Sequence, residues 1–176
     1  MGIGKSFLLS LVAFVGLNFV FLILDAFIAG TFNAIIATIQ TAPLMIIYYL
    51  FSSIASVPSI ILNWVIVDPL FNSTMTFLVM GLGFLIAPLI AAILAGYLAE
   101  SKFEGFVGWL LTALVSTVAM IVGVIPTLSA TFVSTLNSLY GWTGFEVMLI
   151  SLVISCIINI IFYGFFSLLV SKTEYY

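Results

Sequence analysis

Four long runs of apolar residues dominate the pattern of hydrophobic and polar positions along this chain. They cover residues 7–28, 76–98, 106–126 and 147–170. A helix of about 20 apolar residues is long enough to cross the hydrocarbon core of a membrane, which is about 30 Å thick. The pattern therefore predicts four transmembrane helices in an all-α integral membrane protein, a polytopic helical bundle.

The apolar segment at 31–72 has no single interpretation, because prolines and paired serines interrupt it. The interruptions are Pro43, Ser52 with Ser53, Pro58 and Pro69. Proline removes a backbone donor and breaks or bends a helix. Two interpretations stay open. The segment could form two short spans at about 33–52 and 55–71, giving six spans in total, or a re-entrant pair that does not cross.

Composition strengthens the membrane interpretation and makes a separate soluble domain unexpected. Hydrophobic residues make up 65% of the 176 residues and charged residues only 5%, against about 25% charged in an ordinary soluble domain. No soluble fold could bury so much apolar surface. We therefore expect residues 1–176 to form a single transmembrane domain in contact with the lipid bilayer.

The few charged residues predict how the chain is oriented. Lys5, Lys102 and Lys172 are the only basic side chains, and basic residues concentrate on the cytoplasmic side of membrane proteins. All three share that side if an even number of spans precedes residue 99, as in either the four-span or the six-span arrangement. We expect cytoplasmic termini, a location in the cell membrane, and an outside position for the sequon at Asn72, where a glycan could be attached.

Missing residue types argue against several classes of function. The chain has no His and a single Cys, so imidazole-ligated metals, a Cys cluster and a His-assisted nucleophile are not expected. Three lysines, no arginine and a net charge of −3 favour neither phosphate nor nucleic-acid binding. The only aspartates are Asp25 and Asp68, and Asp68 precedes a proline as in a loop turn, so a facing aspartyl pair is not expected. We expect no enzyme activity, cofactor, metal site, nucleotide or nucleic-acid partner.

Small residues recur every four positions in the predicted span at 76–98. They are Gly83, Ala87, Ala91, Ala95 and Ala99. On a helix this spacing produces one face without bulk, which lets another backbone approach closely in lipid. We expect a tight helix-packing interface there, either with another helix of the same chain or with a different subunit.

Two acidic residues near the ends of predicted spans are candidates for a solute or ion site. Asp25 lies about one turn from the outer end of the first span, and Glu146 opens the last span. Ionisable groups in membrane segments are costly and are functional candidates by default. Asn63 and Gln40, in the ambiguous segment, could line an outer-facing cavity with them. The structural alternative is that Glu146 offsets a helix dipole and that Asp25 reaches the headgroups or bonds a hydroxyl.

A polar stripe marks the last predicted span. Ser151, Ser155 and Asn159 are four residues apart, which puts them on one helix face. Such a stripe can line a solute path, although hydrogen bonding between helices is the commoner role and contributes about 0.6 kcal/mol per contact on average in lipid.

Two functions fit these features. The first is a non-catalytic subunit that packs within, or stabilises, a larger complex of membrane protein subunits, and it predicts co-purification with fixed partners. The alternative is a small-solute-binding or transport component with an outer-facing polar cavity. It predicts that Asp25→Asn and Glu146→Gln change solute uptake.

Overall fold

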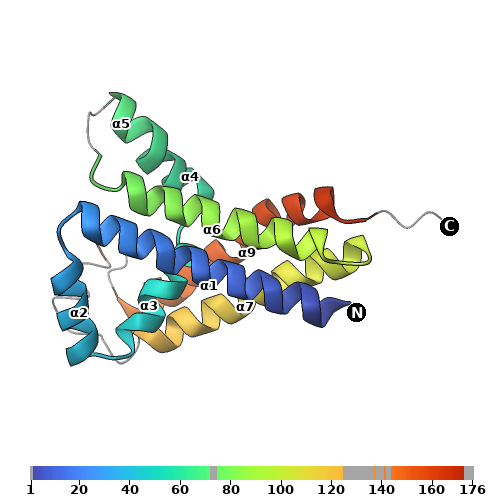
Figure 1. The fold of residues 1–176 in the computed structure, drawn as a ribbon, viewed down its shortest axis with the longest axis horizontal. Coiled ribbons are helices and arrows are strands. Elements are labelled where there is room, and N and C mark those ends of the chain that lie inside the picture. The colour runs from blue at the N-terminus through green and yellow to red at the C-terminus, as the bar shows by residue number, and fades with distance from the viewer. Residues whose placement is uncertain (1, 72–74, 125–136, 138–140, 142–143, 173–176) are drawn as a thin grey trace.

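The computed structural model describes residues 2–71, 75–124, 137, 141 and 144–172 (Figure 1). Within these ranges the chain is helical, and no strand occurs. Four helices are long and apolar enough to cross a membrane: α1 (Ile3–Ile28), α6 (Leu78–Tyr97), α7 (Lys102–Val124) and α9 (Phe145–Val170). The prediction of an all-helical chain with four long apolar helices is confirmed. The helix ends lie within a few residues of the predicted ones, except that residues 125 and 126 lie outside the described ranges.

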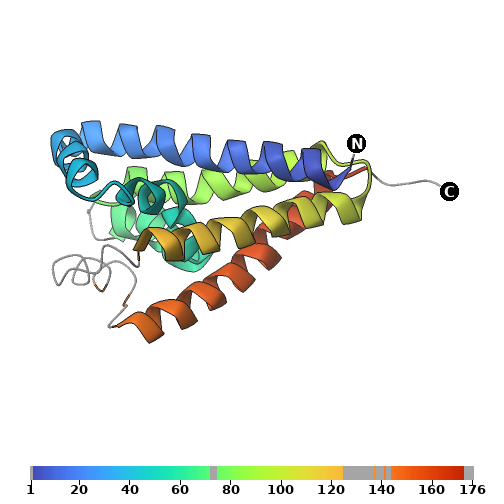
Figure 2. The same cartoon turned by 90° about the horizontal axis from the view of Figure 1, so that it is seen from below.

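These four helices form an antiparallel bundle (Figures 1 and 2). Helix α1 packs against α6 and α7, and α9 packs against the same two helices from another side. The beginning of α1, the turn between α6 and α7, and the end of α9 lie together at one end of the bundle. We call this the lysine end, because Lys5, Lys102 and Lys172 are there. Two of the four long helices, α1 and α6, precede residue 99.

Short helical elements occupy the stretch between α1 and α6. They are α2 (Phe32–Thr41), α3 (Met45–Phe51), the 3₁₀ turn η1 (Ser52–Ala55), α4 (Pro58–Leu62), the π-helical turn η2 (Asn63–Val67) and α5 (Asp68–Phe71). None of them is long enough to cross a membrane by itself. The first of the two short spans considered above is divided between α2 and α3 at Ala42 and Pro43, because proline cannot donate a backbone hydrogen bond.

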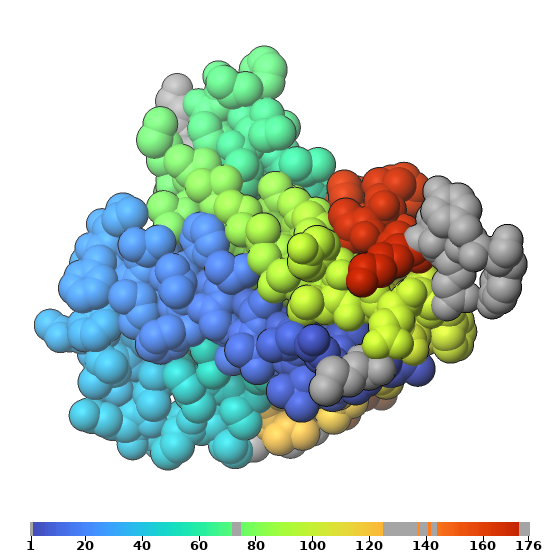
Figure 3. Space-filling view, turned by 45° about the vertical axis from the view of Figure 1, so that its right-hand side comes forward, coloured from blue at the N-terminus to red at the C-terminus, as the bar shows by residue number. Residues whose placement is uncertain are grey.

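Residues 45–71 have the shape of a re-entrant pair, and we call them the re-entrant segment. The limb Met45–Ala55 and the limb Pro58–Phe71 are bent by 92° at the break between them. The first limb runs from the end opposite the lysines to the middle of the bundle, and the second returns toward the same end (Figures 1 and 2). The second limb stands out from the bundle surface (Figure 3), anchored where Ile61 and Trp64 pack against Phe84 of α6.

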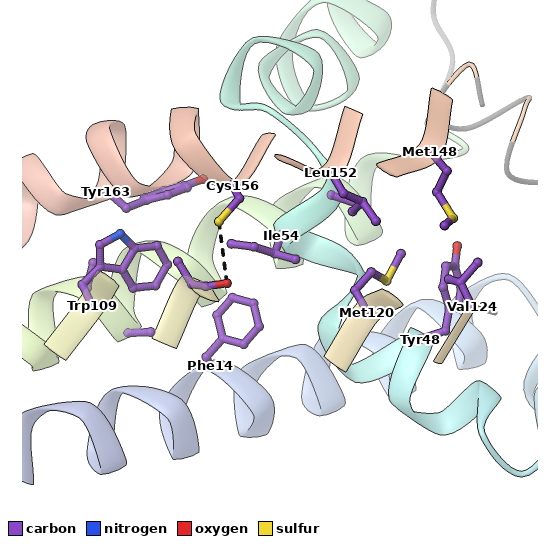
Figure 4. Packing of buried hydrophobic residues seen from close by; sticks show 14 of the residues in the cluster. Phe14, Tyr48, Ile54, Trp109, Met120, Val124, Met148, Leu152, Cys156 and Tyr163 are labelled. Carbon is purple, nitrogen blue, oxygen red and sulfur yellow. Dashed lines mark hydrogen bonds between the residues drawn. The ribbon is translucent and has the colours of Figure 1, made fainter. Parts of the chain in front are cut away.

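The tip of the re-entrant segment belongs to the main hydrophobic core. Ile54 is buried among Phe14 of α1, Trp109 of α7 and Leu152 of α9 (Figure 4). Element η1 also contacts α6, so one short turn lies among all four long helices. The 3₁₀ turn and the extended residue Ser56 that follows it are therefore buried inside the bundle.

The small-residue face of α6 is covered by helices of the same chain. Its alanines Ala87, Ala91 and Ala95, and Ala99 just beyond the end of α6, are 0–1% exposed. A Cβ added at Gly83 would contact the ring of Phe21 in α1. At the lysine end, a Cβ on the neighbouring Gly96 would meet the backbone of Ser167 in α9. The close helix approach expected from the spacing thus joins α6 to both α1 and α9.

The re-entrant shape predicts a labelling pattern. Gln40 precedes the re-entrant segment and Thr76 follows it, and both residues are exposed. Each is replaced by cysteine in a Cys156→Ser background. We expect an impermeant maleimide to reach both positions from the same side of a sealed vesicle, and Lys102→Cys from the other side. Labelling of Gln40→Cys and Thr76→Cys from opposite sides would mean that the segment crosses the membrane once.

Candidate functional site

The best candidate site is the junction between the re-entrant tip and the middle of α9. Asn159 lies about halfway along α9, roughly 21 Å from its start at 1.5 Å per residue. Its side-chain nitrogen donates hydrogen bonds to the carbonyl oxygens of Ile54, at 2.9 Å, and Ser56, at 3.1 Å. One amide therefore holds the end of the first limb and the break that follows it. The two carbonyls also fix the orientation of the amide, because a carbonyl accepts hydrogen bonds and cannot donate them.

Several polar atoms at this junction have no hydrogen-bond partner among the described residues. They are the hydroxyls of Ser53, Ser56 and Tyr163 and the side-chain oxygen of Asn159. All four residues are at most 1% exposed. Burying a polar group without a partner is costly, so an unsatisfied cluster inside a bundle is a candidate for ligand or water binding.

The polar stripe of α9 continues further than the three residues first recognised. Its buried members are Ser155, Asn159, Tyr163, Ser167 and Ser171, each four positions after the one before. Ser151, which the pattern also predicted, is only partly buried. The stripe therefore runs inside the protein from the re-entrant tip to the lysine end.

Large side chains pack tightly around the stripe. The indole nitrogen of Trp109 donates to the backbone oxygen of Asn159 at 3.2 Å. The rings of Trp109 and Tyr163 meet edge to face at 5.7 Å between centroids, and Phe14 lies next to Trp109 at 6.5 Å. The Cys156 thiol is buried and approaches the Ala113 carbonyl at 4.0 Å (Figure 4), which fits a packing role for this cysteine.

The four residues predicted for an outer-facing site lie on different elements. Glu146, Asn63 and Gln40 are exposed, on α9, η2 and α2 respectively. The Asp25 carboxylate is half-buried and accepts a hydrogen bond from the backbone amide of Met80. Met80 is in the first turn of α6, where backbone N–H groups lack helical partners and a carboxylate offsets the helix dipole. A shared cavity of these four residues stays a prediction, and the sequon at Asn72 lies outside the described residues.

The junction was only partly recognisable in the sequence. In the sequence, Ser52 and Ser53 look like interruptions of an apolar segment, whereas in the structure both are buried. Tyr163, Ser167 and Ser171 are not among the predicted residues, yet the four-residue spacing that begins at Ser151 continues through them. That spacing is the signal that could have identified them.

Comparison with known proteins identifies no relative: no protein-family model, no curated protein and no solved structure matches this chain. The functional argument therefore depends on the physical chemistry of the described residues.

Proposed function

We propose that this protein is an integral membrane transport component that binds a small polar solute and passes it through the interior of its helix bundle. The observation that carries the proposal is the buried re-entrant tip with its unpartnered polar atoms. Non-helical backbone at membrane depth is tolerated where it is enclosed by protein or lines a watery cavity. Interrupted helices at mid-depth are also how many transporters build their substrate sites.

The α9 stripe supports a route from this tip to the lysine end. Tyr163 and Ser167 have hydroxyls without partners among the described residues, and Ser171 lies beyond them at the end of α9. Burying such hydroxyls adds nothing to helix packing, because an apolar residue of the same size would avoid the desolvation cost. A passing solute would supply the missing hydrogen bonds.

The proposed location is the cell membrane, with both termini and the lysine end in the cytoplasm. Three lysines at one end of the bundle support this orientation, because basic residues concentrate on the cytoplasmic side. The re-entrant segment would then enter from the outside.

A packing subunit of a larger complex, the first function predicted from the sequence, is the second candidate. The small-residue face that motivated it is covered within the chain by α1 and α9. A partner subunit would therefore contact the outer faces of α1 and α9, where large apolar side chains such as Leu8, Val12, Ile157 and Ile161 are exposed. Lipid acyl chains would cover the same faces equally well.

Solute flux through purified protein in vesicles tests the transport proposal. We expect proteoliposomes to swell or shrink faster than protein-free vesicles when a permeating polar solute is supplied in an osmotic step. Tyr163→Phe is expected to slow that flux at least twofold. It removes only an unpartnered hydroxyl and keeps the ring against Trp109, so the stability should stay the same or rise.

The same measurement separates the interior route from the outer-facing site. Asp25→Asn and Glu146→Gln should leave the flux unchanged if the route passes the re-entrant tip, and should change it if the outer acidic residues bind the solute. A panel of uncharged and ionic solutes that shows no protein-dependent flux would overturn the transport proposal.

A further inference from the structure

We infer that the re-entrant tip and α9 form a binding site for one small uncharged molecule that donates and accepts hydrogen bonds. The inference rests on the proposed function and names the class of solute. The binding atoms are the hydroxyl oxygens of Ser53 and Ser56 and the side-chain oxygen of Asn159, which have no partner among the described residues.

Contacts of the Asn159 amide nitrogen bring together the residues that carry these atoms. The Asn159 side chain reaches the carbonyl of Ser56 and that of Ile54, the residue after Ser53. The amide nitrogen is used in those two bonds, so the amide oxygen is the end left without a partner. An amide oxygen only accepts hydrogen bonds, and a serine hydroxyl both donates and accepts them. A ligand that fits must therefore bring at least one donor.

The tip serines differ from the buried hydroxyls that are satisfied within their own helices. Thr112, Thr117 and Ser171 donate to the carbonyl four residues earlier in their own helices, as hydroxyls in apolar helices commonly do. For Ser53 that carbonyl belongs to Tyr49, which the Ser52 hydroxyl already approaches at 3.5 Å. Ser56 follows the helix break and has an extended backbone, with ψ of 137°.

The charge of the surroundings selects an uncharged ligand. All buried side chains in the described part of the chain are uncharged. An ion at this depth would have no countercharge, and burying an unpaired charge is far more costly than burying a neutral polar group. The close packing of Phe14, Ile54 and Trp109 around the tip favours a molecule of a few heavy atoms, such as a short amide or polyol.

Trp109 is a built-in reporter for this site, because its indole is bonded to the backbone of Asn159 and is fully buried. In a Trp64→Phe, Trp142→Phe background it is the only indole in the chain. We expect acetamide and glycerol to change Trp109 emission in a saturable way, and sodium or potassium chloride to leave it unchanged.

Serine variants locate the binding atoms in that background. Ser53→Ala with Ser56→Ala is expected to weaken the apparent affinity at least fivefold. The matched control is Ser10→Ala with Ser116→Ala, which removes two buried hydroxyls that also lack partners but lie in regular helices. The control should keep the affinity of the parent protein.

Three results would overturn the inference: no saturable response, an equal response in the Ser53→Ala, Ser56→Ala variant, or a response to salt alone. The last would assign the tip to an ion. Flux that persists after binding at the tip is lost would overturn the site and leave the transport function standing. Saturable binding in a protein that supports no flux would support the site and overturn transport.

Discussion

Replacing Asn159 with alanine is expected to lower the free energy of unfolding by about 2–4 kcal/mol, because buried acceptors that lose their donor cost about 1–3 kcal/mol each. The acceptors are the carbonyls of Ile54 and Ser56, which lie where the re-entrant segment breaks. The value exceeds the average of about 0.6 kcal/mol for polar contacts between membrane helices. Losing a typical contact between two helices leaves the backbone hydrogen bonds within each helix intact. The tip carbonyls, in contrast, lie outside the α-helices. Reversible unfolding in mixed micelles measures the loss.

Asn18→Ala is the matched control for this prediction. Asn18 is also a buried asparagine, 4% exposed, in a long helix, but its side chain donates to Phe14 of the same helix at 3.0 Å. That carbonyl belongs to a regular helical turn, so removing the amide should cost less than about 1 kcal/mol. Equal losses in Asn159→Ala and Asn18→Ala would contradict the anchoring role of Asn159.

Gly96→Val is expected to destabilise the bundle by about 3 kcal/mol or more, the upper end for overpacked cores. A Cβ at Gly96 would collide with the backbone oxygen of Ser167 and reach Val170 at 2.8 Å. Backbone cannot rotate away as a side-chain end can, so α6 and α9 would have to separate. Gly105 of α7 lies close by, since a Cβ there would be 2.9 Å from the Gly96 Cα. The valine side chain would therefore disturb three helices at the lysine end.

Gly16→Val controls for the change in helix propensity. Gly16 also lies inside a long helix, and a Cβ there has no heavy atom within 4 Å. We expect its loss of stability to be within about 1 kcal/mol, with either sign. The two variants are compared by the fraction of protein that stays monodisperse after heating in detergent. Size-exclusion chromatography measures that fraction. If Gly96→Val tolerates heat as well as Gly16→Val does, the close approach of α6 to α9 is wrong.

The features that could be predicted are those that depend on neighbouring residues in the chain. The four long helices follow from runs of about 20 apolar residues, whose need to avoid water does not depend on the fold. The face that carries Ser155 and Asn159 follows from helical spacing alone. The small-residue face of α6 was recognisable for the same reason, although the spacing could not say which helix would cover it.

The segment at 31–72 shows where such reasoning stops. Pro43 and Pro58 mark where helices must break, but a break does not determine whether the chain continues across the bundle or turns back. The direction is decided by Ile54, which packs among three helices, and by Asn159, which is 105 positions away from Ile54 in the sequence. Asp25 is a second case, because its partner is a backbone amide at the start of α6, a group that carries no sequence signature.

By itself, the sequence determined the all-helical class, the four long apolar helices, the grouping of the lysines at one end and the polar face of α9, since each depends on local hydropathy, spacing or charge. The tertiary structure decided that the re-entrant tip reaches the middle of the bundle, that Asn159 holds it there, and that hydroxyls of Ser53, Ser56 and Tyr163 are left without partners inside the described part of the chain. These features arise from contacts between residues far apart in sequence. Buried backbone carbonyls need hydrogen-bond donors, and this need selects one arrangement of the chain.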